Sequence, residues 1–244
     1  MTDLVTSNVT DHYIKITFDD GKVNIMSPRM LGALHDAFDQ ALAYERPIIL
    51  TGRPGIFSAG FDIKVIRGDS AVEQHNMLRL GAELALKVLT YPFPVVTACT
   101  GHALPMGAFL MLASDVRIGV EGDFRIGMNE VAIGLTVPYF AIELARSRLT
   151  PAYFNRSITT GEQFKPSEAV LAGYLDMVVS PEAMDEKSEA IATVLALGTH
   201  MPSHAASKLR ARQPTIDAMR KAIDSELTLE NARAARKRAA KEAA

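Results

Sequence analysis

The chain has 244 residues, of which 48% are hydrophobic and 22% are charged, and this balance excludes disordered and fibrous classes of protein. Its formal net charge of −2 gives no general electrostatic reason to expect nucleic acid, whose binding usually requires a basic face. We therefore expect a folded domain with no nucleic-acid partner.

The first part of the chain alternates between strand and helix patterns. Residues 13–18 alternate and are rich in β-branched side chains, which predicts a strand, and Asp-Asp-Gly at 19–21 predicts a turn, so we expect an opening hairpin or meander. Ser27 is a predicted N-cap, with Pro28 at the first helical position. After this helix, the apolar run at 47–51 predicts a buried strand.

The order of strand, small-residue loop and helix then repeats. The spacing of apolar residues predicts a helix over 73–89 and a short strand over 94–99. A second small-residue loop at 101–107 leads into an apolar helix at 108–113, and two more short strands are expected between 115 and 127. Strands that alternate with helices in this way predict an α/β fold with parallel pairing.

The pattern is helical from Pro138 onwards. We expect a helix over 182–197 and a long, Ala-rich amphipathic helix over 203–239. Such a helix is marginal alone, so it must dock on the core or on a neighbouring subunit. The basic cluster at 233–241 is interpreted as a solvated helix face.

Cysteine and histidine usage gives no indication of a metal ion. The single cysteine, Cys99, rules out an internal disulfide and any multi-cysteine site, and the six histidines show no paired zinc spacing. The first four residues have neither a basic start nor an apolar signal region, and no apolar run approaches the ~20 residues of a membrane span. We therefore expect a cytoplasmic protein.

The small-residue stretch at 52–63 follows a predicted buried strand and leads into a helix. Such a turn can aim successive backbone N–H groups at a negatively charged ligand. It can equally be a structural turn that uses glycine for a positive φ angle. The stretch lacks the Gly-Lys-Ser/Thr ending of a phosphate-binding loop, which argues against nucleotide hydrolysis.

Three motifs occur in an order that resembles one family. They are Ile-Phe-Ser-Ala-Gly-Phe-Asp-Ile at 56–63, Gly-His-Ala-Leu-Pro-Met-Gly at 101–107, and Met-Asn-Glu-Val-Ala-Ile-Gly-Leu at 128–135. Together they resemble the crotonase superfamily of acyl-CoA enzymes. The resemblance implies an α/β fold in which a spiral of repeated ββα units spans residues 1–190. It also implies that the helical region 191–244 mediates assembly into a homotrimer or a dimer of trimers.

The resemblance also implies roles for individual residues. The backbone N–H groups of Phe61 and Met106 match the two donors of an oxyanion hole. The positions that match substrate-binding or CoA-binding residues are Ser58, Ala59, Gly60, Asp62, Ile63, Gly107 and Phe109. Asp62 has the alternative role of capping the following helix. Coenzyme A is part of the acyl-CoA thioester substrate, so no separate cofactor is expected. Lys22, Arg29 and Arg53 are near the expected phosphate site, but no spacing selects among them.

The reaction depends on the number of carboxylates. Hydratases of the superfamily present two glutamates, and here the first position is Phe109 while the second is Glu130. A single glutamate suits the transfer of a proton between two carbons of an acyl thioester, and the sequence is similar to the 3,2-enoyl-CoA isomerase branch. We therefore expect an enzyme that converts 3-enoyl-CoA to 2-enoyl-CoA. Apolar neighbours should raise the pKa of Glu130.

Other interpretations remain open. The chain can be a 2-enoyl-CoA hydratase in which Glu130 alone activates water, or a catalytically weak acyl-CoA-binding protein. Glu130 can also be a surface carboxylate near a helix start. Glu143 and His102 are weaker candidates for an acid or base.

Overall fold

A six-stranded sheet, the larger of the two main sheets, forms the centre of the protein. The computed structural model describes residues 3–242 and the side chains of residues 3–238. In spatial order the larger sheet contains β1 (Val5–Val9), β2 (Ile14–Phe18), β4 (Ile48–Thr51), β7 (Val95–Cys99), β9 (Val116–Val120) and β12 (Met177–Val179). Only the β1–β2 pair in this sheet is antiparallel, so the expected α/β fold with parallel pairing is confirmed.

The chain alternates between the larger sheet and a smaller, four-stranded sheet, and this alternation produces a spiral. The smaller sheet contains, in spatial order, β11 (Gln163–Phe164), β10 (Ile126–Gly127), β8 (Gly101–Ala103) and β5 (Gly55–Ser58). Three successive segments each give one strand to the larger sheet and the next to the smaller one: β4 then β5, β7 then β8, β9 then β10. A further pair joins β3 (Ile25–Met26) to β6 (Gly60–Phe61) in parallel. This repeat is the expected crotonase-like spiral of ββα units.

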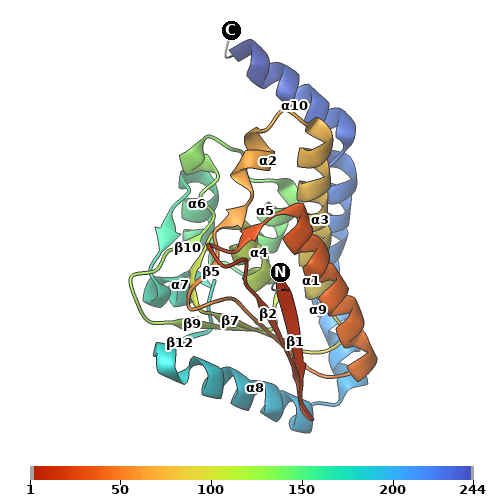
Figure 1. Cartoon of the computed structure of the whole chain (residues 1–244), viewed down its shortest axis with the longest axis vertical. Helices are drawn as coiled ribbons and strands as arrows, with labels where there is room; N and C mark the ends of the chain where they lie inside the picture. The colour runs from red at the N-terminus through yellow and green to blue at the C-terminus, as the bar shows by residue number, and fades with distance from the viewer. Residues whose placement is uncertain (1–2, 243–244) are drawn as a thin grey trace.

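Helices cover both faces of the larger sheet. They are α1 (Pro28–Ala41), α2 (Ile63–Arg67), α3 (Ala71–Thr90), α4 (Pro105–Ala113), α5 (Tyr139–Arg146), α6 (Pro151–Thr160), α7 (Pro166–Ala172), α8 (Met184–Gly198), α9 (Met201–Glu226) and α10 (Leu229–Glu242), with short 3₁₀ turns η1 (Leu42–Tyr44), η2 (Val131–Ile133) and η3 (Pro181–Ala183). Helices α1, α3 and α9 lie side by side along one flank, and α8 covers the opposite side of the sheet (Figure 1). Because both faces are covered, β4 and β7 consist entirely of buried residues.

The boundaries confirm several expectations. The Ser27 Oγ accepts a hydrogen bond from the Met30 N–H at 3.2 Å, so the expected cap of α1 is present. The opening hairpin lies one strand earlier than the 19–21 turn suggested, because β2 pairs with β1 and the strand after that turn pairs with β6. The short strands β11 and β12 interrupt a region that the sequence pattern indicated to be helical.

The prediction of one long helix over 203–239 is wrong. The chain leaves helical geometry at Leu227, whose φ and ψ are −84° and 62°, and a new helix begins at Leu229. Thr228 Oγ1 accepts a hydrogen bond from the Asn231 N–H at 3.1 Å, as an N-cap does. Leu227 is buried, so the break directs an apolar side chain into the protein. The side chain of Lys241, in the basic cluster, lies outside the described residues, as do Met1 and Thr2.

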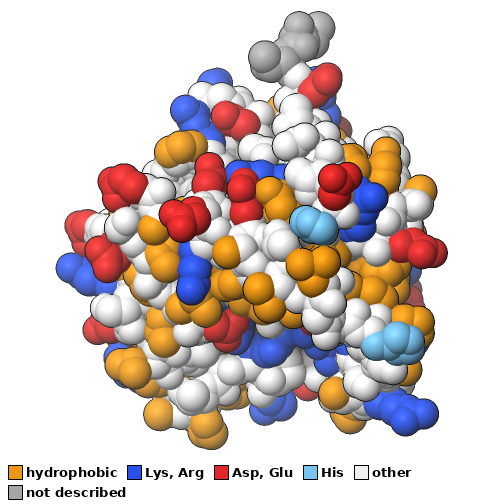
Figure 2. Space-filling view, turned by 90° about the horizontal axis from the view of Figure 1, so that it is seen from below, with side chains coloured by type: hydrophobic (Ala, Val, Ile, Leu, Met, Phe, Trp, Pro, Cys, Tyr) orange, Lys and Arg blue, Asp and Glu red, His pale blue; other side chains and the backbone are white. Residues whose placement is uncertain are grey.

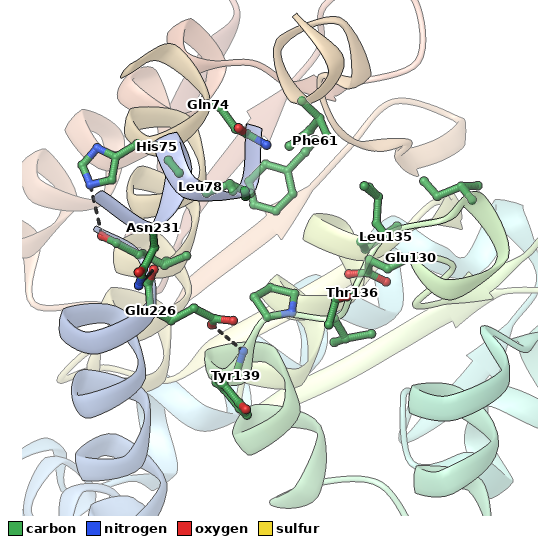
Figure 3. Close-up of a pocket in the computed structure, with 18 of the residues that line it drawn as sticks. Phe61, Gln74, His75, Leu78, Glu130, Leu135, Thr136, Tyr139, Glu226 and Asn231 are labelled. Carbon is green, nitrogen blue, oxygen red and sulfur yellow. Dashed lines mark hydrogen bonds between the residues drawn. The ribbon is translucent and has the colours of Figure 1, made fainter. Parts of the chain in front are cut away.

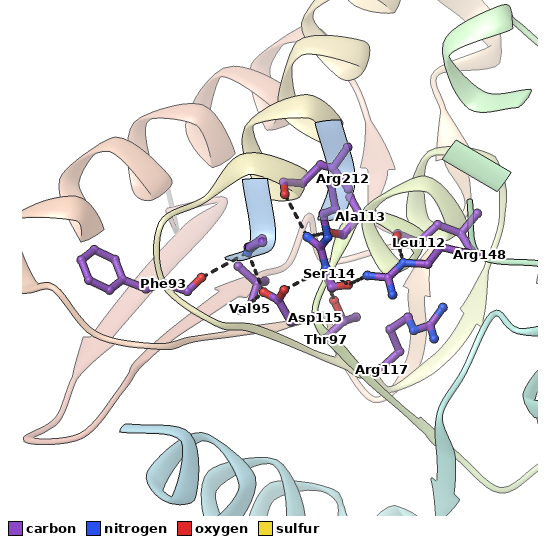
Figure 4. A network of polar contacts seen from close by, with 12 residues as sticks. Phe93, Val95, Thr97, Leu112, Ala113, Ser114, Asp115, Arg117, Arg148 and Arg212 are labelled. Carbon is purple, nitrogen blue, oxygen red and sulfur yellow. Dashed lines mark hydrogen bonds and ion pairs between the residues drawn. The ribbon is translucent and has the colours of Figure 1, made fainter. Parts of the chain in front are cut away.

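A buried polar network fixes α9 to the sheet. Asp115 Oδ2 is 2.7 Å from Lys208 Nζ, and Asp115 Oδ1 is 2.8 Å from Arg212 Nη2 (Figure 4). Asp115 also accepts a hydrogen bond from the Val95 N–H at 2.8 Å. Arg148 donates to the Leu112 carbonyl at 3.1 Å on the same side of the network. These contacts hold the position of α9 relative to the core.

Figure 2 shows one face on which basic, acidic and hydrophobic side chains are interspersed. Across residues 3–242, none of the helices combines the length and the apolar character that crossing a membrane requires.

Candidate active site

A cavity of about 1110 Å³ lies among β6, α3, the segment around η2 and the corner between α9 and α10. Phe61, Gln74 and Leu78 line one side, and Glu130 and Thr136 line the other (Figure 3). This volume is at the upper end of what small-molecule sites offer, and it suits an extended ligand.

The two small-residue turns lie against each other at one end of this cavity. The Leu104 N–H donates to the Ser58 carbonyl at 2.9 Å. Gly60 has a φ angle of +90°, and a Cβ at this position would stand only 3.2 Å from Pro105 Cδ. Glycine is therefore required at Gly60 both for its backbone conformation and for the close approach of the two turns.

This approach brings the two expected oxyanion donors into neighbouring positions. Phe61 directly follows Gly60, and Met106 directly follows Pro105. Met106 is in the first turn of α4, where an N–H has no intrahelical carbonyl to bind. The backbone N–H groups of Phe61 and Met106 therefore lie on two adjacent turns, as the expected oxyanion hole requires. Phe61 lines the cavity, and Met106 is not among the lining residues.

Ser58 and Gly107 support the turns from behind. The buried Ser58 Oγ donates to the Asn24 carbonyl at 2.8 Å and accepts from the Gly60 N–H at 3.0 Å. A Cβ at Gly107 would stand 2.9 Å from Ser58 Cβ. Both residues therefore stabilise the packing of the two turns, because the Ser58 side chain bonds to protein atoms and a side chain on Gly107 would meet Ser58.

The other expected ligand-binding residues occupy two kinds of position. Ala59 and Ile63 line the cavity. The Asp62 side chain accepts a hydrogen bond from the Lys64 N–H at 2.9 Å and caps α2, which confirms its alternative role. Phe109 is fully buried and packs edge-to-face on Phe140, with ring centres 5.5 Å apart.

Glu130 places a carboxylate in the cavity wall. It precedes η2, and its carbonyl accepts hydrogen bonds from Ile133 at 3.0 Å and from Leu135 at 2.8 Å, which fix the local backbone. The residue is only 6% exposed, and Oε2 has no hydrogen-bond partner. Burial raises the pKa of Glu130 to about 7, which confirms the expected direction. A carboxyl group with this pKa can accept or donate a proton near neutrality.

Sequence reasoning missed the cavity wall that the C-terminal helices supply. Glu226 Oε2 accepts a hydrogen bond from the Tyr139 N–H at 2.7 Å, and burial raises the pKa of Glu226. The His75 Nε2 is 3.1 Å from the Leu227 carbonyl oxygen, which ties α3 to the α9–α10 corner (Figure 3). Asn231 Nδ2 donates to the Glu226 carbonyl at 3.0 Å. No motif marks these residues, because the packing of α9 on α3 and α5 and of α10 on α3 brings them to the site.

The weaker candidates lie in structural contacts. His102 Nδ1 accepts a hydrogen bond from the Arg125 N–H at 3.0 Å. Glu143 pairs with Arg146 at 3.4 Å on the same helix. Arg53 donates to the Lys22 carbonyl at 2.9 Å. None of these residues lines the cavity.

The fold and the cavity agree with a comparison to known families. The model of the enoyl-CoA hydratase/isomerase family matches residues 9–242. The chain belongs to this family. It is 31% identical over 185 residues to the human mitochondrial enoyl-CoA delta isomerase 1, and the alignment covers 75% of this chain and 58% of the human protein. The chain therefore spans less than two thirds of that curated relative.

Solved structures of the enoyl-CoA hydratase/isomerase family show the same fold. An enoyl-CoA hydratase from Mycobacterium ulcerans has a TM-score of 0.89 and 39% identity, and the match covers 94% of this chain and 99% of that one. A structure described as an enoyl-CoA isomerase of Mycobacterium tuberculosis has a TM-score of 0.88 and 39% identity, with 93% and 98% covered. Both descriptions, enoyl-CoA hydratase and enoyl-CoA isomerase, therefore occur among solved structures that are 39% identical to this chain.

Proposed function

We propose that this protein is an enoyl-CoA isomerase that shifts the double bond of 3-enoyl-CoA to 2-enoyl-CoA. The observation that carries the proposal is the contrast between Glu130 and Phe109. Glu130 lines the cavity, and its buried Oε2 has no hydrogen-bond partner, whereas Phe109 is buried against Phe140 at the position where hydratases are expected to have their other glutamate.

The proposed reaction uses Glu130 first as a base and then as an acid. Its carboxylate removes a proton from C2, and the electron pair of the C2–H bond forms a C1–C2 double bond as the carbonyl pair moves onto the thioester oxygen. When the enolate collapses, the electron pair on oxygen re-forms the carbonyl, and the C1–C2 π pair becomes the C2–C3 double bond. The former C3–C4 π pair takes a proton from the Glu130 carboxyl group to form the new C4–H bond, which returns Glu130 to its carboxylate form. The proton balance is zero, so no co-reactant is needed.

The backbone N–H groups of Phe61 and Met106 would stabilise the enolate oxygen. Loss of one such donor costs on the order of 10²–10³ in rate in other enzymes. The raised pKa of Glu130 supports the same proposal, because a base with a pKa near the working pH combines a useful ionised fraction with sufficient basicity.

Hydration of 2-enoyl-CoA is the second candidate, and Glu226 is the observation that favours it. Glu226 lines the same cavity as Glu130 and offers a second carboxylate from a different element. However, one of its oxygens is already bound by the Tyr139 N–H. The isomerase therefore remains our first proposal.

Two substrates distinguish these functions. The purified protein is incubated with 3-enoyl-CoA and, separately, with 2-enoyl-CoA, while conjugation and hydration are followed independently. Conjugation without hydration is expected. Hydration without conjugation would select the hydratase, and tight CoA binding with neither reaction would select an acyl-CoA-binding protein.

Assembly and location are also proposals. Val194 and Leu197 on α8 are 69% and 73% exposed, and apolar side chains of this kind are suited to a subunit interface. Together with the family resemblance, they support a homotrimer or a dimer of trimers. Light scattering that shows a monomer at every concentration would contradict it. We propose a cytoplasmic location and no cofactor apart from the coenzyme A of the substrate.

A further inference from the structure

Three buried polar side chains without hydrogen-bond partners occur around the segment that carries Glu130. Their atoms are Oε2 of Glu130, Oγ of Ser157 and Oη of Tyr174. Buried polar atoms are nearly always paired, because an unpaired one loses its contact with water without compensation. Three such atoms in one region therefore call for a physical explanation.

Helix α6 brings Ser157 to this region. Ser157 is the one buried residue of α6, which packs against η2, the turn that begins directly after Glu130. Gly161, which ends α6, approaches Ala132 so closely that a Cβ on Gly161 would stand 3.0 Å from the Ala132 nitrogen. The helix thus has little freedom to move away from the Glu130 segment.

Tyr174 enters the same region from the end of α7. It follows the left-handed cap residue Gly173, is fully buried, and lies with its ring centre 6.0 Å from that of Phe164. Burial raises the pKa of the Tyr174 phenol. The neighbouring Ser157 hydroxyl lowers that pKa, and the charge of the Glu130 carboxylate raises it. The three polar groups therefore lie within electrostatic reach of one another.

We propose that Tyr174 and Ser157 are positioning residues that act on Glu130 through an ordered water held by all three side chains. A buried water needs two to four polar partners, and these three side chains provide them. The phenol donates to the water, and the water donates to one carboxylate oxygen of Glu130. This arrangement fixes the orientation of the carboxylate and leaves its other oxygen for the substrate.

The proposal rests on the proposed function of Glu130 as the proton-transferring base, and its first test needs no turnover. The pKa of Glu130 is measured from the carboxylate band in infrared difference spectra between the wild-type protein and Glu130→Gln. Hydrogen bonds to the charged form lower the pKa of a carboxyl group. Tyr174→Phe and Ser157→Ala should therefore each raise this pKa by about one pH unit.

A double variant tests whether the two hydroxyls share one water. Because either substitution alone disturbs the shared water, Tyr174→Phe combined with Ser157→Ala should raise the pKa by less than the sum of the single effects. Fully additive shifts would overturn the shared site. Tyr153→Phe is the matched control, since Tyr153 also packs on Phe164, with ring centres 5.3 Å apart, but has an intermediate rather than a buried environment.

The remaining outcomes separate this proposal from the proposed function. If both single variants stay folded and leave the pKa of Glu130 unchanged, the two hydroxyls have only a structural role and the proposal is wrong. If the pKa shifts as expected but the wild-type protein does not isomerise 3-enoyl-CoA, the proposed function alone fails. Where isomerisation occurs, the acidic limb of the kcat/KM profile should move by the same amount as the spectroscopic pKa.

Discussion

Gly81 of α3 lies directly against the ring of Phe61. A Cβ on Gly81 would stand 2.5 Å from Phe61 Cε1 and 3.1 Å from Met106 Sδ. The same helix position thus supports both residues whose backbone N–H groups form the proposed oxyanion hole. The two side chains point towards α3, which explains why Phe and Met are compatible with donors that come from the main chain.

Gly81→Ala should therefore damage catalysis through the oxyanion hole. The new methyl group would push the Phe61 ring and shift its backbone N–H. If this donor is lost, kcat should fall by about 10²–10³, with a smaller change in KM. Steady-state kinetics with 3-enoyl-CoA check this expectation.

Gly32→Ala is a matched control for the change at Gly81. Gly32 is also in a helix, but a Cβ there would meet no atom within 4 Å. This variant should keep its kcat and be slightly stabilised, because alanine has the higher helix propensity. Equal kcat values for the Gly81 and Gly32 variants would contradict the role of Gly81.

Glu130→Gln should remove the proton transfer itself. General acid–base groups contribute about 10²–10⁴ in rate, so kcat/KM should fall within this range. In the wild-type protein kcat/KM should rise through pH 7 as Glu130 ionises and then level off. The variant should lack this titration, whereas Glu143→Gln, a change in a surface ion pair, should retain it.

The sequence was sufficient for the parts of the site that lie on local motifs. The turns around Gly60 and Pro105, the cap at Asp62 and the carboxylate of Glu130 are each set by a few consecutive residues. Glu226 and His75 could not be predicted, because they meet at the cavity only through the packing of α9 and α10 on α3 and of α9 on α5. Nor does helical spacing reveal the break at Leu227, where burial of one side chain overrides helix propensity.

Burial of Glu130 should also reduce stability at alkaline pH. Its folded pKa of about 7 lies above the ordinary value of 4.5, so the folded state binds more protons between these values. Stability is therefore lost as the pH rises through this window, by about 3 kcal/mol for this group. Glu130→Gln removes the penalty and should raise the free energy of unfolding by up to this amount at pH 8.

The comparison at a second pH makes this expectation specific. At pH 5 the folded Glu130 is mostly protonated, and the gain from Glu130→Gln should fall to less than about 1 kcal/mol. Urea unfolding at both pH values measures the two gains. A gain that is the same at pH 5 and pH 8 would show that Glu130 does not carry the raised pKa.

Substitution of Asp115 should lower the free energy of unfolding strongly, because Asp115 attaches α9 to the core. Its single carboxylate pairs with both Lys208 and Arg212, and Asp115→Asn would leave these two cations without that counter-charge. Breaking a buried ion pair in this way costs about 3–5 kcal/mol. Asp185→Asn, which breaks an exposed pair with Lys15, should cost less than about 1 kcal/mol.

The pH dependence of this network has a definite sign. Burial, with a smaller contribution from the neighbouring arginines Arg212 and Arg148, lowers the pKa of Lys208 to about 8 despite its contact with Asp115. Between pH 8 and the ordinary value of 10.5, the unfolded chain therefore binds more protons at this site than the folded one. Stability should rise with pH across this window, and Lys208→Met should abolish that rise. Urea unfolding between pH 8 and pH 10 checks this, and a slope that persists in the variant would assign the titration to another group.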